Sequence, residues 1–248
     1  MRRVAIITEG QTEYIFTREF LFRIINPAKM SFTCIKLNAY RIERVRDHIC
    51  PNPEIHFEII NVQNDERVLY YIKQNEQNLV EQGKYDEIIG LRDMYSFEYT
   101  KQSPDGIDDN ITEKEKGKHN LIIQSMKYKD RIKLYYGIME IEAWFLSMFN
   151  IFSKICSELS VQNIKSQLGY DLSIIDPQNE FFKPSQQVND IFMLCGWTYN
   201  KKLGDIEKIT SQMDITDFNI ATENNRCNSF NVFFQDFLKD FHPFLLYN

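Results

Sequence analysis

The sequence lacks any apolar run of the roughly 20 residues that a membrane-spanning helix needs. Its N-terminus carries Arg2 and Arg3, but the apolar stretch that follows is too short for a signal peptide. Only 9 glycines and 7 prolines occur in 248 residues, against 43% hydrophobic residues, 19 Phe and 13 Tyr. We therefore expect a folded cytoplasmic protein with an aromatic-rich core and no association with a membrane.

Cysteine and histidine motifs for zinc are also missing. The five cysteines stand singly, without a CxxC pair and without two histidines at zinc spacing: Cys34, Cys50, Cys156, Cys195 and Cys227. This scatter excludes the common zinc motifs and predicts buried thiols.

The chain has no excess of positive charge, since its formal net charge is −6. That value argues against general electrostatic binding of nucleic acid, which depends on clustered Lys and Arg. It does not exclude a phosphate substrate bridged by a metal ion. The sequence also lacks a glycine-rich phosphate loop and a suitably flanked Ser or Cys nucleophile, so metal chemistry is the better candidate.

The opening segment carries the strongest local pattern. Val4–Ile7 predicts a buried strand, Gly10 a tight turn, and residues from Thr12 to Ile25 a helix. Glu9 then stands at the carboxyl end of a strand, where open α/β sheets bind ligands. Glu13 is the one charge on the helix face that should pack on the sheet. Two such carboxylates repel unless a cation lies between them, although Glu13 could instead only complement the helix dipole.

The rest of the chain alternates between expected strands and helices, which predicts an α/β fold with a mostly parallel sheet. Strands are expected at Ser31–Leu37, His56–Val62, Glu87–Leu91 and Ile132–Met139. Helices are expected from the N-cap Asp65 to about Glu81 and from about Asp109 to Lys127, and Arg41–Arg46 could also be helical. A long polar loop is expected from Tyr95 to Asp109. Beyond Phe152 the pattern is helical and irregular. We therefore divide the chain into an α/β domain at 1–152 and a mainly helical region at 153–248 packed on it.

Acids recur where the expected strands end. Besides Glu9, Asp93 follows the strand at 87–91, and Glu140 and Glu142 follow the strand at 132–139. If these strands are parallel neighbours, their ends meet at one edge and the carboxylates can share Mg²⁺ or Mn²⁺. Asp93 could instead pair with Arg92, and the two glutamates could be helix-entry acids. Once a helix begins, Glu140 and Glu142 diverge by about 200°, so we expect one of them to be a direct ligand.

Alternating charges surround Lys118 and His119 in the expected helix after residue 109. A solvated helix face explains such a run, and contacts with a phosphate are the other interpretation. Together with Gly10, these two residues are the candidates for substrate binding.

Three blocks carry a resemblance to a known family: Glu9–Glu13, Leu91–Tyr95 and Glu140–Leu146, with Tyr199–Lys201 and Arg226–Phe230 similar to late blocks of the same group. They resemble the TOPRIM-like proteins of the RloB-like and neighbouring uncharacterised families, which are relatives of the OLD-type nucleases. The likeness spans most of the chain.

The resemblance implies a TOPRIM fold that binds Mg²⁺. On this basis Glu9 is a ligand or general acid/base, Glu13 and Asp93 are ligands, and Glu142 matches the later acidic position. The family's second aspartate is Tyr95 here, so the site would hold a single metal, recruit Glu140 or be catalytically weak.

Two functions follow from the residues and the resemblance. The first is a Mg²⁺-dependent nuclease in an anti-phage or restriction-linked system, with DNA, RNA or a nucleotide as its substrate. The second is a non-catalytic partner subunit of an AAA-type ATPase, whose acidic patch is a binding surface.

Overall fold

The computed structural model describes residues 1–38, 41–63, 67–223 and 226–246. A six-stranded sheet in the order β3-β2-β4-β1-β5-β6 forms its centre. The strands are β1 (Arg2–Thr8), β2 (Met30–Asn38), β3 (Arg41–His48), β4 (Ile55–Asn61), β5 (Glu87–Asp93) and β6 (Ile132–Gly137). β2 and β3 pair antiparallel, whereas the other neighbours pair parallel. The predicted α/β class with a mostly parallel sheet is therefore confirmed.

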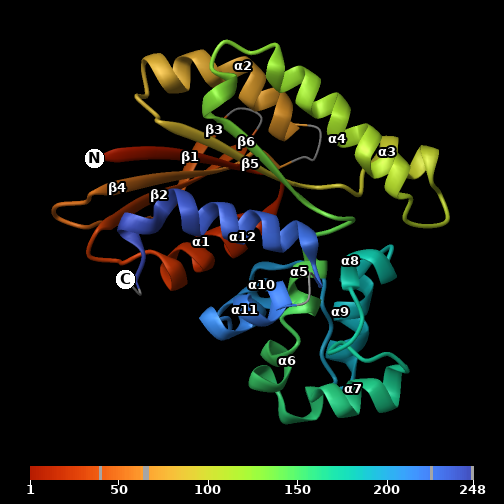
Figure 1. Ribbon diagram of the computed structural model, residues 1–248. Coiled ribbons are helices and arrows are strands. Elements are labelled where there is room, and N and C mark those ends of the chain that lie inside the picture. The colour runs from red at the N-terminus through yellow and green to blue at the C-terminus, as the bar shows by residue number, and fades with distance from the viewer. Residues whose placement is uncertain (39–40, 64–66, 224–225, 247–248) are drawn as a thin grey trace.

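Helices cover both faces of the sheet (Figure 1). α2 (Arg67–Glu81), α3 (Phe97–Gln102) and α4 (Asp109–Gln124) lie on one side, and α1 (Gln11–Ile24) and α12 (Asn228–Phe241) on the other. The remaining helices are α5 (Glu142–Ser147), α6 (Asn150–Ile155), α7 (Val161–Leu168), α8 (Pro177–Glu180), α9 (Pro184–Met193), α10 (Leu203–Thr210) and α11 (Ile215–Thr222). Within the described ranges, no helix combines the length and apolar character needed to cross a membrane.

Alternation along β1 builds two separate cores. Val4 and Ile6 face the core formed with α1, α5 and α12, whereas Ala5 and Ile7 face the core formed with α2. This follows from the two-residue period of a strand, which sends successive side chains to opposite faces. The first core is rich in aromatic rings, as predicted.

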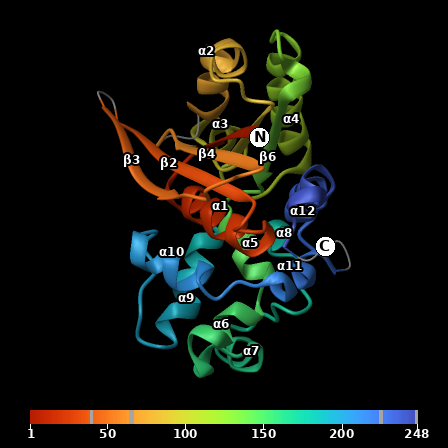
Figure 2. The same cartoon turned by 90° about the vertical axis from the view of Figure 1, so that its left-hand side faces the viewer.

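Helix α12 returns from the end of the chain to the sheet. Its Phe237 and Phe241 lie with their ring centroids 6.4 and 5.5 Å from that of Phe57 in β4. Figure 2 shows most of the other helices after β6 gathered below the sheet. Phe152, where the sequence suggests a domain boundary, lies inside α6 and belongs to the same core as α1. The two-domain division stays a prediction.

Several local expectations differ from the structure. The possible helix at Arg41–Arg46 is strand β3, because pairing with β2 supplies backbone hydrogen bonds that the charged pattern does not reveal. The polar loop from Tyr95 to Asp109 contains α3, which Ser96 caps by accepting a hydrogen bond from the Tyr99 N–H. The expected N-cap Asp65 lies outside the described residues.

Candidate functional site

Glu9 and Asp93 meet at the carboxyl edge of the sheet. Glu9 directly follows β1, and Asp93 ends the neighbouring parallel strand β5. The Glu9 carboxylate accepts a hydrogen bond from the Asp93 backbone N–H at 2.8 Å, and the Glu9 N–H donates to the Leu91 carbonyl at 3.2 Å. Two acids 84 positions apart therefore share one strand edge.

Glu13 is buried in the first turn of α1. Its Oε2 accepts a hydrogen bond from the Gly10 N–H at 2.8 Å, so one carboxylate oxygen caps the helix. Gly10 has φ −139°, an extended conformation, and hence is not needed for a left-handed turn. Its role is space, because a Cβ at this position would lie 2.9 Å from Glu13 Oε2.

Glu142 joins the same group from the start of α5. Its side chain is fully buried and accepts hydrogen bonds from the Tyr199 hydroxyl at 2.7 Å and the Lys201 ammonium at 3.2 Å. The Thr12 hydroxyl at the start of α1 lies 3.4 Å from its Oε1. We call Glu9, Glu13, Asp93 and Glu142 the carboxylate cluster.

Glu140 points away from α1, toward α9. Its carboxylate accepts hydrogen bonds from the Ser185 N–H and hydroxyl at 2.8 and 2.9 Å, and it contacts Lys201 at 2.8 Å. Lys201 therefore bridges Glu140 and Glu142. The two carboxylates share Lys201, but Glu140 also binds Ser185 of α9 whereas Glu142 contacts Thr12 of α1. Which of them is a direct metal ligand stays a prediction.

The turn between β6 and α5 holds Asp93. Asp93 Oδ1 accepts a hydrogen bond from the Ile141 N–H at 2.7 Å. A Cβ on Gly137 would lie 2.8 Å from that same oxygen and 2.7 Å from the Ile141 nitrogen. Met139 has φ +58°, an uncommon conformation for a residue with a side chain. Gly137 was not among the residues expected at the site, although a glycine at a strand end beside acids is a signal that the sequence contains.

Burial and mutual repulsion raise the pKa values of the cluster. Burial, with the nearby Glu142 charge, raises the pKa of Glu13 to about 7. Burial followed by the charges of Glu13 and Glu9 holds the pKa of Asp93 well above its usual range. Burial also raises the pKa of Glu142, against the opposing charge of Lys201. Although burial alone would lower it, the carboxylates around Lys201 hold its pKa above the usual value.

This donor set fits a hard divalent cation in chemistry and charge. Its donors are carboxylate oxygens, and a cation would relieve the repulsion that raises their pKa values. Their spacing is looser than that of a closed site. Among the described residues, one group has three ligand atoms within 4.8 Å of one another: Cys156, Glu158 and Cys195. The described carboxylates of the cluster do not come that close together.

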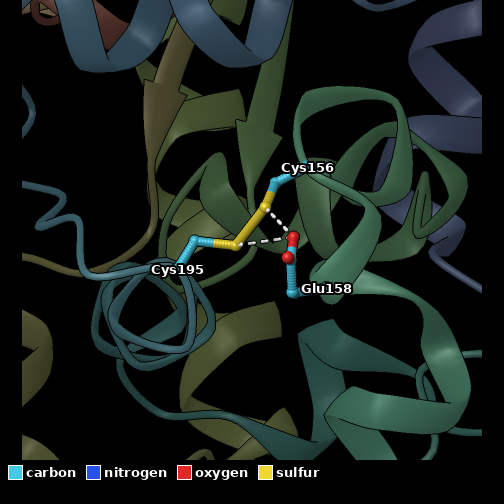
Figure 3. A group of neighbouring side chains, drawn as sticks. All are labelled: Cys156, Glu158 and Cys195. Atoms are coloured by element: carbon cyan, nitrogen blue, oxygen red, sulfur yellow. Dashed lines mark hydrogen bonds between the residues drawn. A yellow bond between two sulfur atoms is a disulfide. The ribbon is translucent and has the colours of Figure 1, made fainter.

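Those three residues form a separate group on the helical side of the molecule (Figure 3). Cys156 and Cys195 are joined in a disulfide, and Glu158 Oε2 lies 2.7 Å from Cys156 Sγ. The prediction of buried thiols is wrong for these two, because a pair 39 residues apart leaves no local motif. It is confirmed for Cys34 and Cys227, whereas the Cys50 thiol is only partly buried.

Lys118 and His119 lie on α4, on the other face of the sheet. Lys118 pairs with Glu115 at 2.6 Å. His119 Nδ1 lies 3.0 Å from the Tyr136 hydroxyl, and its Nε2 lies 3.5 Å from Arg92 Nη1. Burial, with the Arg92 charge, lowers the pKa of His119 to about 4, so its imidazole is neutral at pH 7.

Arg92 does not form the ion pair with Asp93 that the sequence left open. Its Nε donates to the Asp93 backbone carbonyl at 3.2 Å, and its side chain lies beside His119.

Comparison of the chain with protein-family models, curated proteins and solved structures yields no match.

Proposed function

We propose that this protein is a metal-dependent phosphodiesterase of the TOPRIM type that cleaves nucleic acid at the carboxylate cluster. The contact between Glu9 and the Asp93 backbone is the observation that carries the proposal, because it joins two acids from neighbouring parallel strands. Raised pKa values at Glu13 and Asp93 support it, since buried carboxylates with shifted pKa values are typical of functional sites.

In this proposal Glu9, Glu13, Asp93 and Glu142 would hold Mg²⁺ or Mn²⁺. The bound ion would polarise a phosphoryl oxygen and lower the pKa of a water molecule. The chain's own groups set the arrangement: the Ile141 N–H orients Asp93, and Tyr199 and Lys201 orient Glu142. Lys201 also keeps a positive charge at the edge that an incoming phosphate would meet.

The test is cleavage of single- and double-stranded DNA and RNA with Mg²⁺ or Mn²⁺, compared with the same assay in EDTA. Glu9→Gln and Asp93→Asn should each lower the rate by about 100-fold or more, since each removes a charged ligand. Both amides retain an oxygen that can accept the existing backbone hydrogen bond. The exposed Asp105, changed to Asn, is the matched control. Normal cleavage by both site variants would refute the assignment.

A second candidate is a non-catalytic partner of an AAA-type ATPase. Lys201 favours it, because this ammonium already compensates Glu140 and Glu142 inside the protein. The two candidates differ in a metal titration. A rise in melting temperature with Mn²⁺ that Glu9→Gln abolishes favours the nuclease, whereas an unchanged melting temperature favours the partner subunit. The anti-phage setting and the cytoplasmic location belong to the proposal as well.

A further inference from the structure

A cavity lies at the end of β5, on the face of the sheet opposite the carboxylate cluster. It has a volume of about 330 Å³, and α2, α4 and the segment from Arg92 to Ser96 line it. We call it the Arg92 cleft. Its inner wall includes the buried side chains of Leu69 and Met94, and Tyr70 and Lys73 stand at its exposed rim.

Arg92 is a buried cation with no acidic partner among the residues that the structure describes. Its residue is 6% exposed, and no carboxylate of the described residues forms an ion pair with it. Its contacts are the Asp93 carbonyl and the ring of His119, both neutral acceptors. A charge buried without a counter-charge is costly, so an anion in the cleft would be stabilised by this guanidinium.

His119 holds the guanidinium in position. The imidazole stacks on Tyr136, with ring centroids 5.8 Å apart and an interplanar angle of 12°. With the proton on Nδ1, the ring donates to the Tyr136 hydroxyl, and Nε2 is free to accept from Arg92 Nη1. Before any ligand arrives, the Arg92 guanidinium thus has one contact with the backbone, at Asp93, and one with a side chain, at His119.

The rest of the lining suits a molecule with an anionic end and a flat apolar end. Lys73 is exposed and has no ion-pair partner within the described ranges, so it adds a second cation. Glu115 is paired with Lys118, which leaves the exposed Glu98 as the opposing charge at the cleft. Tyr70 is 63% exposed, so its side chain offers a surface on which a base can stack.

We propose that the Arg92 cleft binds a nucleoside phosphate, with Arg92 and Lys73 on the phosphate and Tyr70 against the base. The inference that this unit belongs to the substrate strand rests on the proposed function. Arg92 and Asp93 are consecutive, and their Cα atoms are therefore about 3.8 Å apart. A strand that leaves the cleft can reach the carboxylate cluster by crossing the end of β5.

The experiment measures equilibrium binding in EDTA, so that no metal-dependent step contributes. The probes are adenosine 5′-monophosphate and a fluorescently labelled five-nucleotide single strand. Lys73→Ala should weaken binding of both probes about tenfold, and Arg92→Gln by more, since charge-assisted phosphate contacts are lost. Lys239→Ala on α12, an exposed lysine on the opposite face, should change binding less than twofold.

The two probes separate the possible sources of the ligand. Tighter binding of the oligonucleotide supports a substrate strand, and equal binding supports a free nucleotide at the same site. Equal weakening by Lys73→Ala and Lys239→Ala would overturn the proposal, because the attraction would then be non-specific. Lys73 is exposed, so this variant tests the cleft even if Arg92→Gln fails to fold.

The cleft and the nuclease can fail separately. Binding of either probe in EDTA that survives Asp93→Asn, without any cleavage by the wild type, supports the cleft and refutes the nuclease. Cleavage that depends on Glu9 and Asp93, with neither probe bound in EDTA, overturns the cleft alone.

Discussion

The two faces of the sheet at the carboxyl end of β5 differ in how their buried charges are compensated. On the Asp93 side, several buried carboxylates lie around one partly exposed cation, Lys201. On the Arg92 side, a buried guanidinium lies in an open cleft with neutral acceptors. Successive strand residues point to opposite faces, so two adjacent residues create these two environments.

The difference also has an architectural cause. On the Asp93 side, the β6–α5 turn contacts Asp93, and Tyr199 and Lys201 from the segment before α10 contact Glu142. The Arg92 side is bordered by α2 and α4, which leave a cavity of about 330 Å³. On the acidic side, the protein's own Lys201 compensates the carboxylates, so their stability depends on the packing of that segment. On the basic side, Arg92 can pair with an anion that enters the cleft from solution.

The largest effect should come from removal of the Lys201 charge. Lys201→Met leaves Glu142 buried without its counter-charge, and we expect a loss of about 3 kcal/mol in the free energy of unfolding. Chemical denaturation in EDTA measures it. Adding Glu142→Gln to this variant should restore most of the loss, because the uncompensated carboxylate is then gone. A double variant no more stable than Lys201→Met would show that Lys201 acts by packing instead.

A smaller loss is expected when the turn that holds Asp93 is crowded. Gly137→Ala would place a methyl group 2.7 Å from the Ile141 nitrogen, and backbone must shift to relieve it. We expect a loss of about 2 kcal/mol, the usual cost of overpacking. Gly106→Ala is the control, since nothing lies within 4 Å of its added Cβ. Similar unfolding midpoints for the two variants would contradict this account of the turn.

The smallest effect is a pH dependence with opposite signs on the two sides. In the folded protein the pKa of Glu13 is about 7, against an ordinary value of 4.5. The contribution of this protonated carboxyl to the free energy of unfolding is therefore fully present below pH 4.5 and is lost as the pH rises through 7. In EDTA, Glu13→Gln should remove most of this carboxyl's share of the decline in stability between pH 5 and pH 8. Thermal unfolding across that range measures it.

His119 supplies the opposite sign. Its pKa falls from 6.5 to about 4 on folding, so its contribution is present above pH 6.5 and is lost as the pH falls through 4. His119→Gln should therefore flatten the acid side of the same stability curve. Identical pH profiles for the wild type and both variants would show that neither group is perturbed by its surroundings.

The meeting of Glu9 and Asp93 could be predicted from sequence because it depends on local patterns. Two apolar runs that each end in an acid imply two strand ends, and parallel neighbours bring such ends to one edge. Tyr199 and Lys201 could not be assigned contacts in the same way. Their approach to Glu142 depends on how irregular helices pack, which has no periodic signal in the sequence.

It was harder to predict which face of the sheet a residue lies on than to predict the helix or strand that contains it. Lys118 and His119 stand in the expected helix, but α4 covers the face away from the carboxylate cluster. The same limit explains β3, where pairing with β2 decides the structure of a charged segment. The Cys156–Cys195 disulfide likewise depends on two helical segments coming together.

The position of Lys201 has a consequence for the order of events during synthesis. The acids at positions 9, 93 and 142 emerge from the ribosome well before residue 201. Until that lysine arrives, the growing chain carries carboxylates that repel one another when the sheet edge closes. The buried Glu142 therefore gains its counter-charge only after the segment before α10 has been made.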